Sequence, residues 1–160
     1  MKRIFLSACV LILFFAVGCE KKSSSGVTDI MYLPFTARAY VKIAGSEYSL
    51  LVEKGGANLV SVTVEAPQSL CGMKLSLDET ETLTFDEMNL SEGFAKSIAH
   101  LFYYAFNEHS RLGIIHHERM AVVSFSAFGK EGEISVDTFS GRPVSLRFSE
   151  IFVEFCDFIG

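Results

Sequence analysis

The sequence predicts an α+β domain in which a strongly curved antiparallel sheet, a half-barrel, wraps around one helix. Residues 89–107, NLSEGFAKSIAHLFYYAFN, form the one long segment with helical periodicity. The segments on both sides of it alternate apolar and polar residues, which is the pattern of half-buried strands. Because an apolar helix stripe must be buried, its simplest partner is one face of an antiparallel sheet.

The helix is expected to run from Asn89 to Asn107. Asn89 or Ser91 can cap its first turn, and Glu92 completes a capping box with Asn89. The other face is expected to carry polar residues and two tyrosines: Lys96, Ser97, Tyr103, Tyr104 and Asn107. The apolar stripe recurs every three or four positions and consists of Phe94, Ile98, Leu101, Phe102, Ala105 and Phe106.

Alternating segments predict the strands, which meet at glycine-rich or proline-bounded turns. Before the helix they run from Phe35 to Ile43, Tyr48 to Val52, Val60 to Val64, Met73 to Leu77, and Leu83 to Phe85. After it, a polar connection from Glu108 to Gly113 leads to strands from Met120 to Phe128, Ile134 to Val136, Val144 to Phe148, and Ile151 to Phe155. The sheet is therefore expected to have about eight or nine strands, strongly bent by its twist.

The first residues, MKRIFLSACVLILFFAVGC, have the tripartite pattern of a secretory signal. Lys2 and Arg3 precede an apolar run that is shorter than the roughly 20 residues of a membrane span. The segment that follows, EKKSSSG, is typical of a flexible tether. We expect a leader at 1–18, a tether at 19–30 and a single domain at 31–160.

The end of this leader, Ala16-Val17-Gly18-Cys19, resembles a bacterial lipoprotein signal. The resemblance implies cleavage before Cys19, a diacylglycerol on its thiol, and acyl chains such as palmitate that hold the protein at a membrane. The alternative is an ordinary signal peptide cleaved after Gly18, because Ala16 and Gly18 also satisfy its small-residue rule. Both interpretations export the protein, and the first anchors it to the cell membrane, facing outside the cytoplasm.

The chain carries a formal net charge of −5. Loss of Lys2 and Arg3 with the leader makes the mature domain more acidic still. An acidic surface is repelled by phosphate backbones and by anionic headgroups. Nucleic acid is therefore not expected as a partner, and attachment to a membrane is expected to come from the lipid.

The order of the elements resembles the LolA/LolB-type lipoprotein-carrier superfamily over residues 35–158. The resemblance rests on a proline-bounded hairpin with alternating apolar residues and on the strand after it: Pro67, Leu70, Gly72, Leu75 and Asp78, then Leu83, Phe85 and Leu90. It implies an unclosed half-barrel with a helix over its mouth and a cavity for the acyl chains of lipids or lipoproteins. It transfers no catalytic residue to this chain.

Two functions are compatible with the sequence. One is an anchored lipoprotein that binds an apolar ligand, a lipid or an acylated protein, in the concave sheet. Its expected ligand-binding residues are Leu75, Leu83, Phe85, Phe94, Ile98 and Phe102. The other is a structural or interaction lipoprotein of the envelope whose core is filled and takes no ligand, since apolar stripes usually fill themselves.

Cysteines and histidines are the remaining candidates for chemistry. Cys71 and Cys156 either pair as a disulfide in an exported protein or serve as small buried hydrophobes. The densest group of metal-ligand types matches no ligand spacing, so we expect solvated side chains and no metal. It consists of Glu108, His109, His116, His117 and Glu118.

We expect neither an enzyme nor a cofactor. The sequence has no Ser-His-acid pattern, no glycine-rich phosphate loop and no HExxH motif. Asp86, Glu87 and Glu92 cluster before the helix, where capping and the helix dipole account for carboxylates.

Overall fold

The computed structural model describes residues 33–56, 59–78, 84–85 and 94–159 and forms one sheet with one α-helix on it. In sequence order the elements are β1 Phe35–Ile43, β2 Ser46–Lys54, β3 Val60–Ala66, η1 Gln68–Leu70, β4 Lys74–Leu77, β5 Thr84–Phe85, α3 Phe94–Phe106, η2 Glu108–Ser110, β6 Arg111–His116, β7 Met120–Ala127, β8 Lys130–Asp137, β9 Pro143–Phe148 and β10 Ile151–Ile159. The expected α+β class, a curved antiparallel sheet with one helix, is confirmed.

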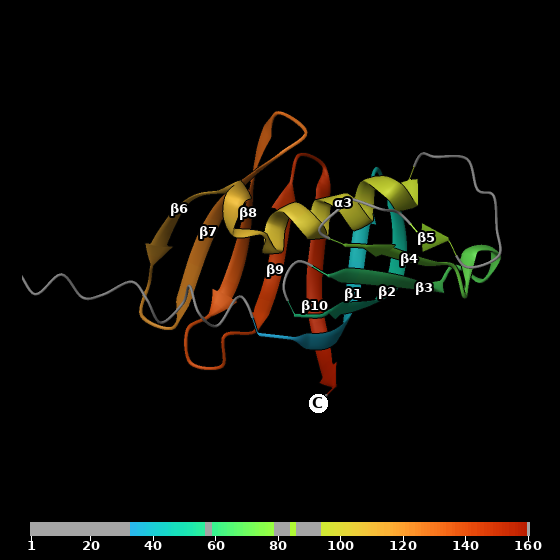
Figure 1. The fold of residues 1–160 in the computed structure, drawn as a ribbon, viewed down its shortest axis with the longest axis horizontal. Helices are drawn as coiled ribbons and strands as arrows, with labels where there is room; N and C mark the ends of the chain where they lie inside the picture. Colours follow the sequence, from blue (N-terminus) through green and yellow to red (C-terminus); the bar gives the residue numbers. More distant parts are fainter. Residues whose placement is uncertain (1–32, 57–58, 79–83, 86–93, 160) are drawn as a thin grey trace, which may run out of the picture.

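Within the described residues the sheet has ten strands, in the order β5-β4-β3-β2-β1-β10-β9-β8-β7-β6. Every pair of neighbours is antiparallel, and β1 joins the two halves of the chain by pairing with both β2 and β10. In Figure 1 β7 to β10 run up and down the view, whereas β3 and β4 run across it. The sheet is therefore strongly twisted, and β5 and β6 are its two edges.

The strand β6 begins inside the polar connection expected from Glu108 to Gly113 and continues to His116, in a segment for which no strand was predicted. Its side chains are exposed or half-buried throughout, so it lacks the alternation by which the other strands were predicted. Pairing with β7 stabilises it as an edge strand. The tenth strand thus comes from backbone pairing and not from an apolar pattern of its own.

The helix α3 crosses the concave face of the sheet (Figure 1). It packs against β3 and β4 and also against β7 and β8. From Ile98 to Phe106 the side chains of α3 are buried or, at His100 and Tyr104, half-buried. Tyr103, expected on the polar face, is buried. A curved sheet reaches around more of a helix than a flat sheet does, so the buried part of α3 is wider than one stripe. The expected helix start and its caps at Asn89, Ser91 and Glu92 lie outside the described residues.

Candidate functional site

The expected ligand-binding site lies between the concave face of the sheet and α3. Alternate residues of β1 and β2, such as Ala37, Ala39, Leu50 and Val52, point into it and are fully buried. Aromatic rings connect the helix to the sheet at close range. Phe102 lies 5.8 Å from Phe155 between ring centroids, and Phe106 lies 5.2 Å from Phe35 in an edge-to-face arrangement.

Three of the six expected ligand-binding residues, Leu75, Ile98 and Phe102, lie together in this core. Phe102 and Leu75 have no exposed surface, and Ile98 has 2%. Leu83 and the side chains of Phe85 and Phe94 lie outside those described. An apolar ligand that contacts the described three must therefore displace α3 or its neighbours.

One charged side chain also points into this apolar face. Lys54 follows Leu50 and Val52 in the alternation of β2, and its residue is 5% exposed. Burial lowers the pKa of its ammonium group, because the charged form loses its hydration. Among the described residues it is the one charged side chain that is buried. The alternation in SLLVEK puts Lys54 on the same face as Leu50 and Val52, so the sequence does contain the signal for this placement.

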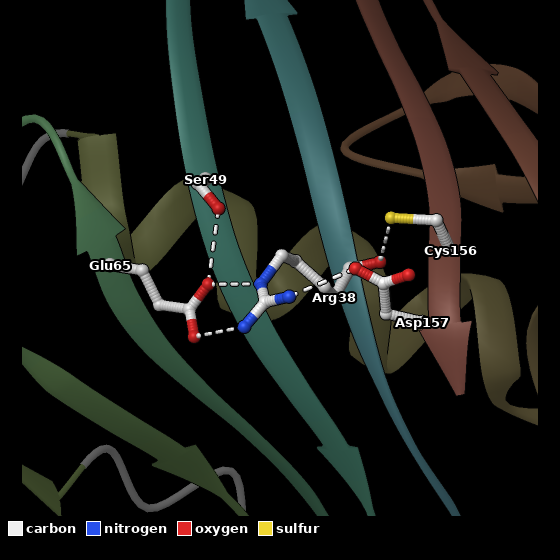
Figure 2. A network of polar contacts seen from close by, with 5 residues as sticks. All are labelled: Arg38, Ser49, Glu65, Cys156 and Asp157. Atoms are coloured by element: carbon white, nitrogen blue, oxygen red, sulfur yellow. Dashed lines mark hydrogen bonds and ion pairs between the residues drawn. The ribbon is translucent and has the colours of Figure 1, made fainter. Parts of the chain in front are cut away.

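The convex face carries a polar network whose residues lie on β3, β2, β1 and β10, four neighbouring strands of the sheet (Figure 2). The guanidinium of Arg38 in β1 donates to both carboxylate oxygens of Glu65 in β3, at 2.6 and 3.2 Å. It also donates to Asp157 in β10 at 2.9 Å. Ser49 in β2 donates its hydroxyl to Glu65 at 3.1 Å. Hydrogen bonds from Arg38 lower the pKa of Glu65, and those to Glu65 and Asp157 raise the pKa of Arg38.

This network connects strands and contains no activated nucleophile. The Cys156 thiol donates to the backbone oxygen of Arg38 at 3.6 Å, and burial raises its pKa, which keeps it protonated. The carboxylates of Glu65 and Asp157 both pair with Arg38, so neither is available as a free base. The backbone of Asp157 has φ +46° at a register shift between β10 and β1. This bulge turns the carboxylate toward Arg38 on the convex face.

Cys71 and Cys156, the two cysteines in the described ranges, are separate free thiols. Strands β1, β2 and β3 lie between β10, which holds Cys156, and the connection that holds Cys71. The disulfide considered from the sequence is therefore not formed. The alternative of a small buried hydrophobe does not describe Cys71 either, because its side chain is exposed.

The three histidines of the group expected to be solvated, His109, His116 and His117, lie on exposed segments. His109 is in η2, His116 ends β6, and His117 and Glu118 belong to the connection between β6 and β7. In the described part of the chain no three His, Cys, Asp or Glu side chains are grouped to hold a metal ion. No helix within the described ranges is long and apolar enough to cross a membrane. Cys19, the expected lipidation site, lies outside those ranges.

A shallow cavity opens where the domain begins. Its volume is about 250 Å³, and residues 33–36, 140–142 and 158–159 line it. These residues come from the start of β1, the connection between β8 and β9, and the end of β10, which lie at one end of the sheet (Figure 1). Arg142 covers the ring of Phe158, 5.0 Å from its centroid. The sequence did not indicate this cavity, because its walls are far apart along the chain.

No protein-family model matches the chain, and no curated protein matches its sequence. Among solved structures, it is similar to an uncharacterized conserved protein from Thermus thermophilus. That similarity has 15% identity and a TM-score of 0.49 and covers 86% of this chain and 87% of that chain. The chain is also similar to the LolA superfamily protein NE2245 from Nitrosomonas europaea, with 9% identity and a TM-score of 0.38, over 83% of this chain and 92% of the other. At these values neither similarity assigns a family or a function.

Proposed function

We propose that this protein is an exported, lipid-anchored envelope lipoprotein whose domain has a filled core and works through its outer surface. The observation that carries the proposal is the burial of α3 in the concave face. From Ile98 to Phe106 its side chains are buried in the core, except those of His100 and Tyr104, which are half-buried. The proposal assigns no catalytic step, since the described carboxylates and thiol of the convex face hold strands together.

The anchor in this proposal is the thioether-linked lipid at Cys19. The leader up to Gly18 and the tether after Cys19 support export and attachment. Burial of acyl chains contributes about 0.8 kcal/mol per methylene, so two or three chains suffice for stable attachment.

Labelled fatty acid supplied to cells that produce the full chain tests the anchor. The wild-type protein is expected to take up label and to enter the detergent phase on phase separation. The Cys19→Ser variant lacks the accepting thiol and is expected to take up none. Cys71→Ser is the matched control and should label like the wild type, because its thiol is not at the cleavage site. A wild-type protein that takes up no label and stays in the aqueous phase would refute the anchor.

A second candidate function is binding of an acidic lipid or fatty acid between α3 and the sheet. The buried Lys54 favours it, because an ammonium group on an apolar face can pair with a carboxylate or phosphate headgroup. Lipid extraction of the purified protein, followed by mass spectrometry and displacement of a fluorescent fatty acid, tests this candidate. Lys54→Met should then weaken fatty-acid binding at least tenfold, whereas Lys42→Met, at an exposed lysine, should leave it unchanged. A purified protein that carries no lipid and binds no fatty acid would exclude this candidate and leave the filled-core function.

A further inference from the structure

Three large apolar side chains are exposed together at the end of the sheet where the domain begins. Phe139 is 92% exposed, Ile159 60% and Leu33 58%. They come from the connection between β8 and β9, the end of β10 and the residue that precedes β1 by two positions. Cross-strand pairing puts Thr36 opposite Ile159, so the first and last of these segments are neighbours. The cavity described above joins both to the connection that carries Phe139.

The connection that carries Phe139 is held by its own hydrogen bonds. The carboxylate of Asp137 accepts from the backbone N–H groups of Phe139 at 3.0 Å and of Ser140 at 2.7 Å. It also accepts from the Ser140 hydroxyl at 3.0 Å. These bonds lower the pKa of Asp137, and the bond from the Ser140 backbone contributes most. The Asp137 carboxylate is therefore ionised at neutral pH. The backbone is therefore pre-organised with Phe139 pointing into solvent, and little further ordering is needed on contact.

The position of the tether identifies the partner of this surface. Residues 20–32 separate the proposed lipid at Cys19 from Leu33, which is itself part of the exposed group. A flexible chain of this length has an end-to-end distance of about 20 Å. The membrane is therefore the nearest apolar phase to this end of the domain. The tether also keeps the domain at a high effective concentration next to the membrane, so that even a small apolar surface can bind there.

We propose that this end of the domain, defined by Leu33, Phe139 and Ile159, docks on the lipid surface that holds Cys19. The proposal rests on the lipid anchor of the proposed function and adds an orientation to it. The exposed Phe139 ring and the aliphatic side chains of Leu33 and Ile159 enter the headgroup region, where large apolar side chains gain free energy by leaving water. Arg142, at the same end, faces the lipid phosphates. The opposite end of the sheet, with the turn at Phe128 between β7 and β8, then points away from the membrane.

Tryptophan is absent from the chain, so one introduced indole reports on one position. The full chain is produced with its leader as Phe139→Trp or as Phe128→Trp. Phe128 is the matched control, because it is also an exposed Phe in a connection, with 55% exposure, at the opposite end. Each purified protein is checked for fatty-acid label and reconstituted into vesicles of phosphatidylethanolamine and phosphatidylglycerol with brominated acyl chains.

The indole at position 139 is expected to shift to shorter emission wavelengths and to lose at least half of its intensity to the brominated chains. The indole at position 128 should do neither. Labelled protein in which both indoles respond equally, or in which neither responds, overturns the docking surface while the anchor stands. A blue shift at position 139 without vesicles, together with a dimeric mass, shows a second copy on this surface and also overturns it. Protein without label overturns the anchor, and with it the docking that rests on it.

Discussion

Arg38 and Glu65 form a forked ion pair across β2, with Nε to Oε2 at 2.6 Å and Nη2 to Oε1 at 3.2 Å. The two residues are far apart in sequence, and β1 and β3, which carry them, are not neighbours in the sheet. Both side chains are about one-third exposed. The pair therefore fixes strand order at a partly hydrated surface, where an ion pair contributes modestly to stability.

Stability should depend on this pair in a defined range of pH. The pKa of Glu65 is lowered in the folded protein, chiefly by its hydrogen bond from Arg38. The stabilising contribution is thus present above the ordinary glutamate pKa of about 4.3 and is lost as pH falls through the lower folded value. Glu65→Gln should unfold at a lower temperature than the wild type at neutral pH, and the two melting curves should converge in acid. A difference that stays constant across that range would contradict the linkage.

Phe102 should contribute far more to stability than an exposed phenylalanine. Phe102→Ala removes a fully buried ring that contacts Phe106 and Phe155, which should cost about 3–5 kcal/mol in the free energy of unfolding. Phe139→Ala makes the same chemical change at a side chain that is 92% exposed and should change it by less than about 0.5 kcal/mol. Urea unfolding of both variants in detergent solution measures the difference. Similar losses would mean that α3 does not occupy the core.

Gly132 should resist the addition of a single methyl group. A Cβ there would lie 2.6 Å from Cζ of Phe125 and 2.8 Å from Cδ2 of Phe148, whose stacked rings flank it. Gly132→Ala should therefore cost about 1–3 kcal/mol through overpacking. Gly113→Ala in β6 is the control, because nothing lies within 4 Å of its added Cβ. Equal thermal melts of the two variants would show that the rings move aside without cost.

The two free thiols should react at different rates in the folded protein. Cys71 is exposed, whereas Cys156 is partly buried, with a raised pKa and a hydrogen bond to the Arg38 backbone. A maleimide at neutral pH should modify Cys71 first, and Cys156 should follow at least several-fold more slowly. Cys71→Ser should remove the fast phase and leave the slow one. Full protection of both thiols until a reductant is added would instead reveal a disulfide.

The local pattern of apolar and polar residues was sufficient to predict most of the fold, but not which residues lie at its surface. Alternation located the buried strands, because side chains of one strand point to opposite faces whatever the strand pairs with. It missed β6, whose residues are held by backbone pairing with β7 and not by burial. It also assigned Tyr103 to the outside, because a helix stripe is read as if its partner were flat, whereas this sheet contacts α3 through β3 and β4 as well as β7 and β8.

The sequence by itself determined the α+β class, the course of the buried strands and the apolar side of the helix. Each of these depends on residues close together in the chain, where periodicity and local chemistry suffice. The leader and the export that it implies stay predictions. Only the tertiary structure decided that Arg38, Glu65 and Asp157 meet across four strands, that Lys54 is buried, and that Leu33, Phe139 and Ile159 share one end. Such groupings depend on strand order, register and sheet twist. These properties arise from the summed packing and hydrogen bonding of the whole domain, so no single segment encodes them.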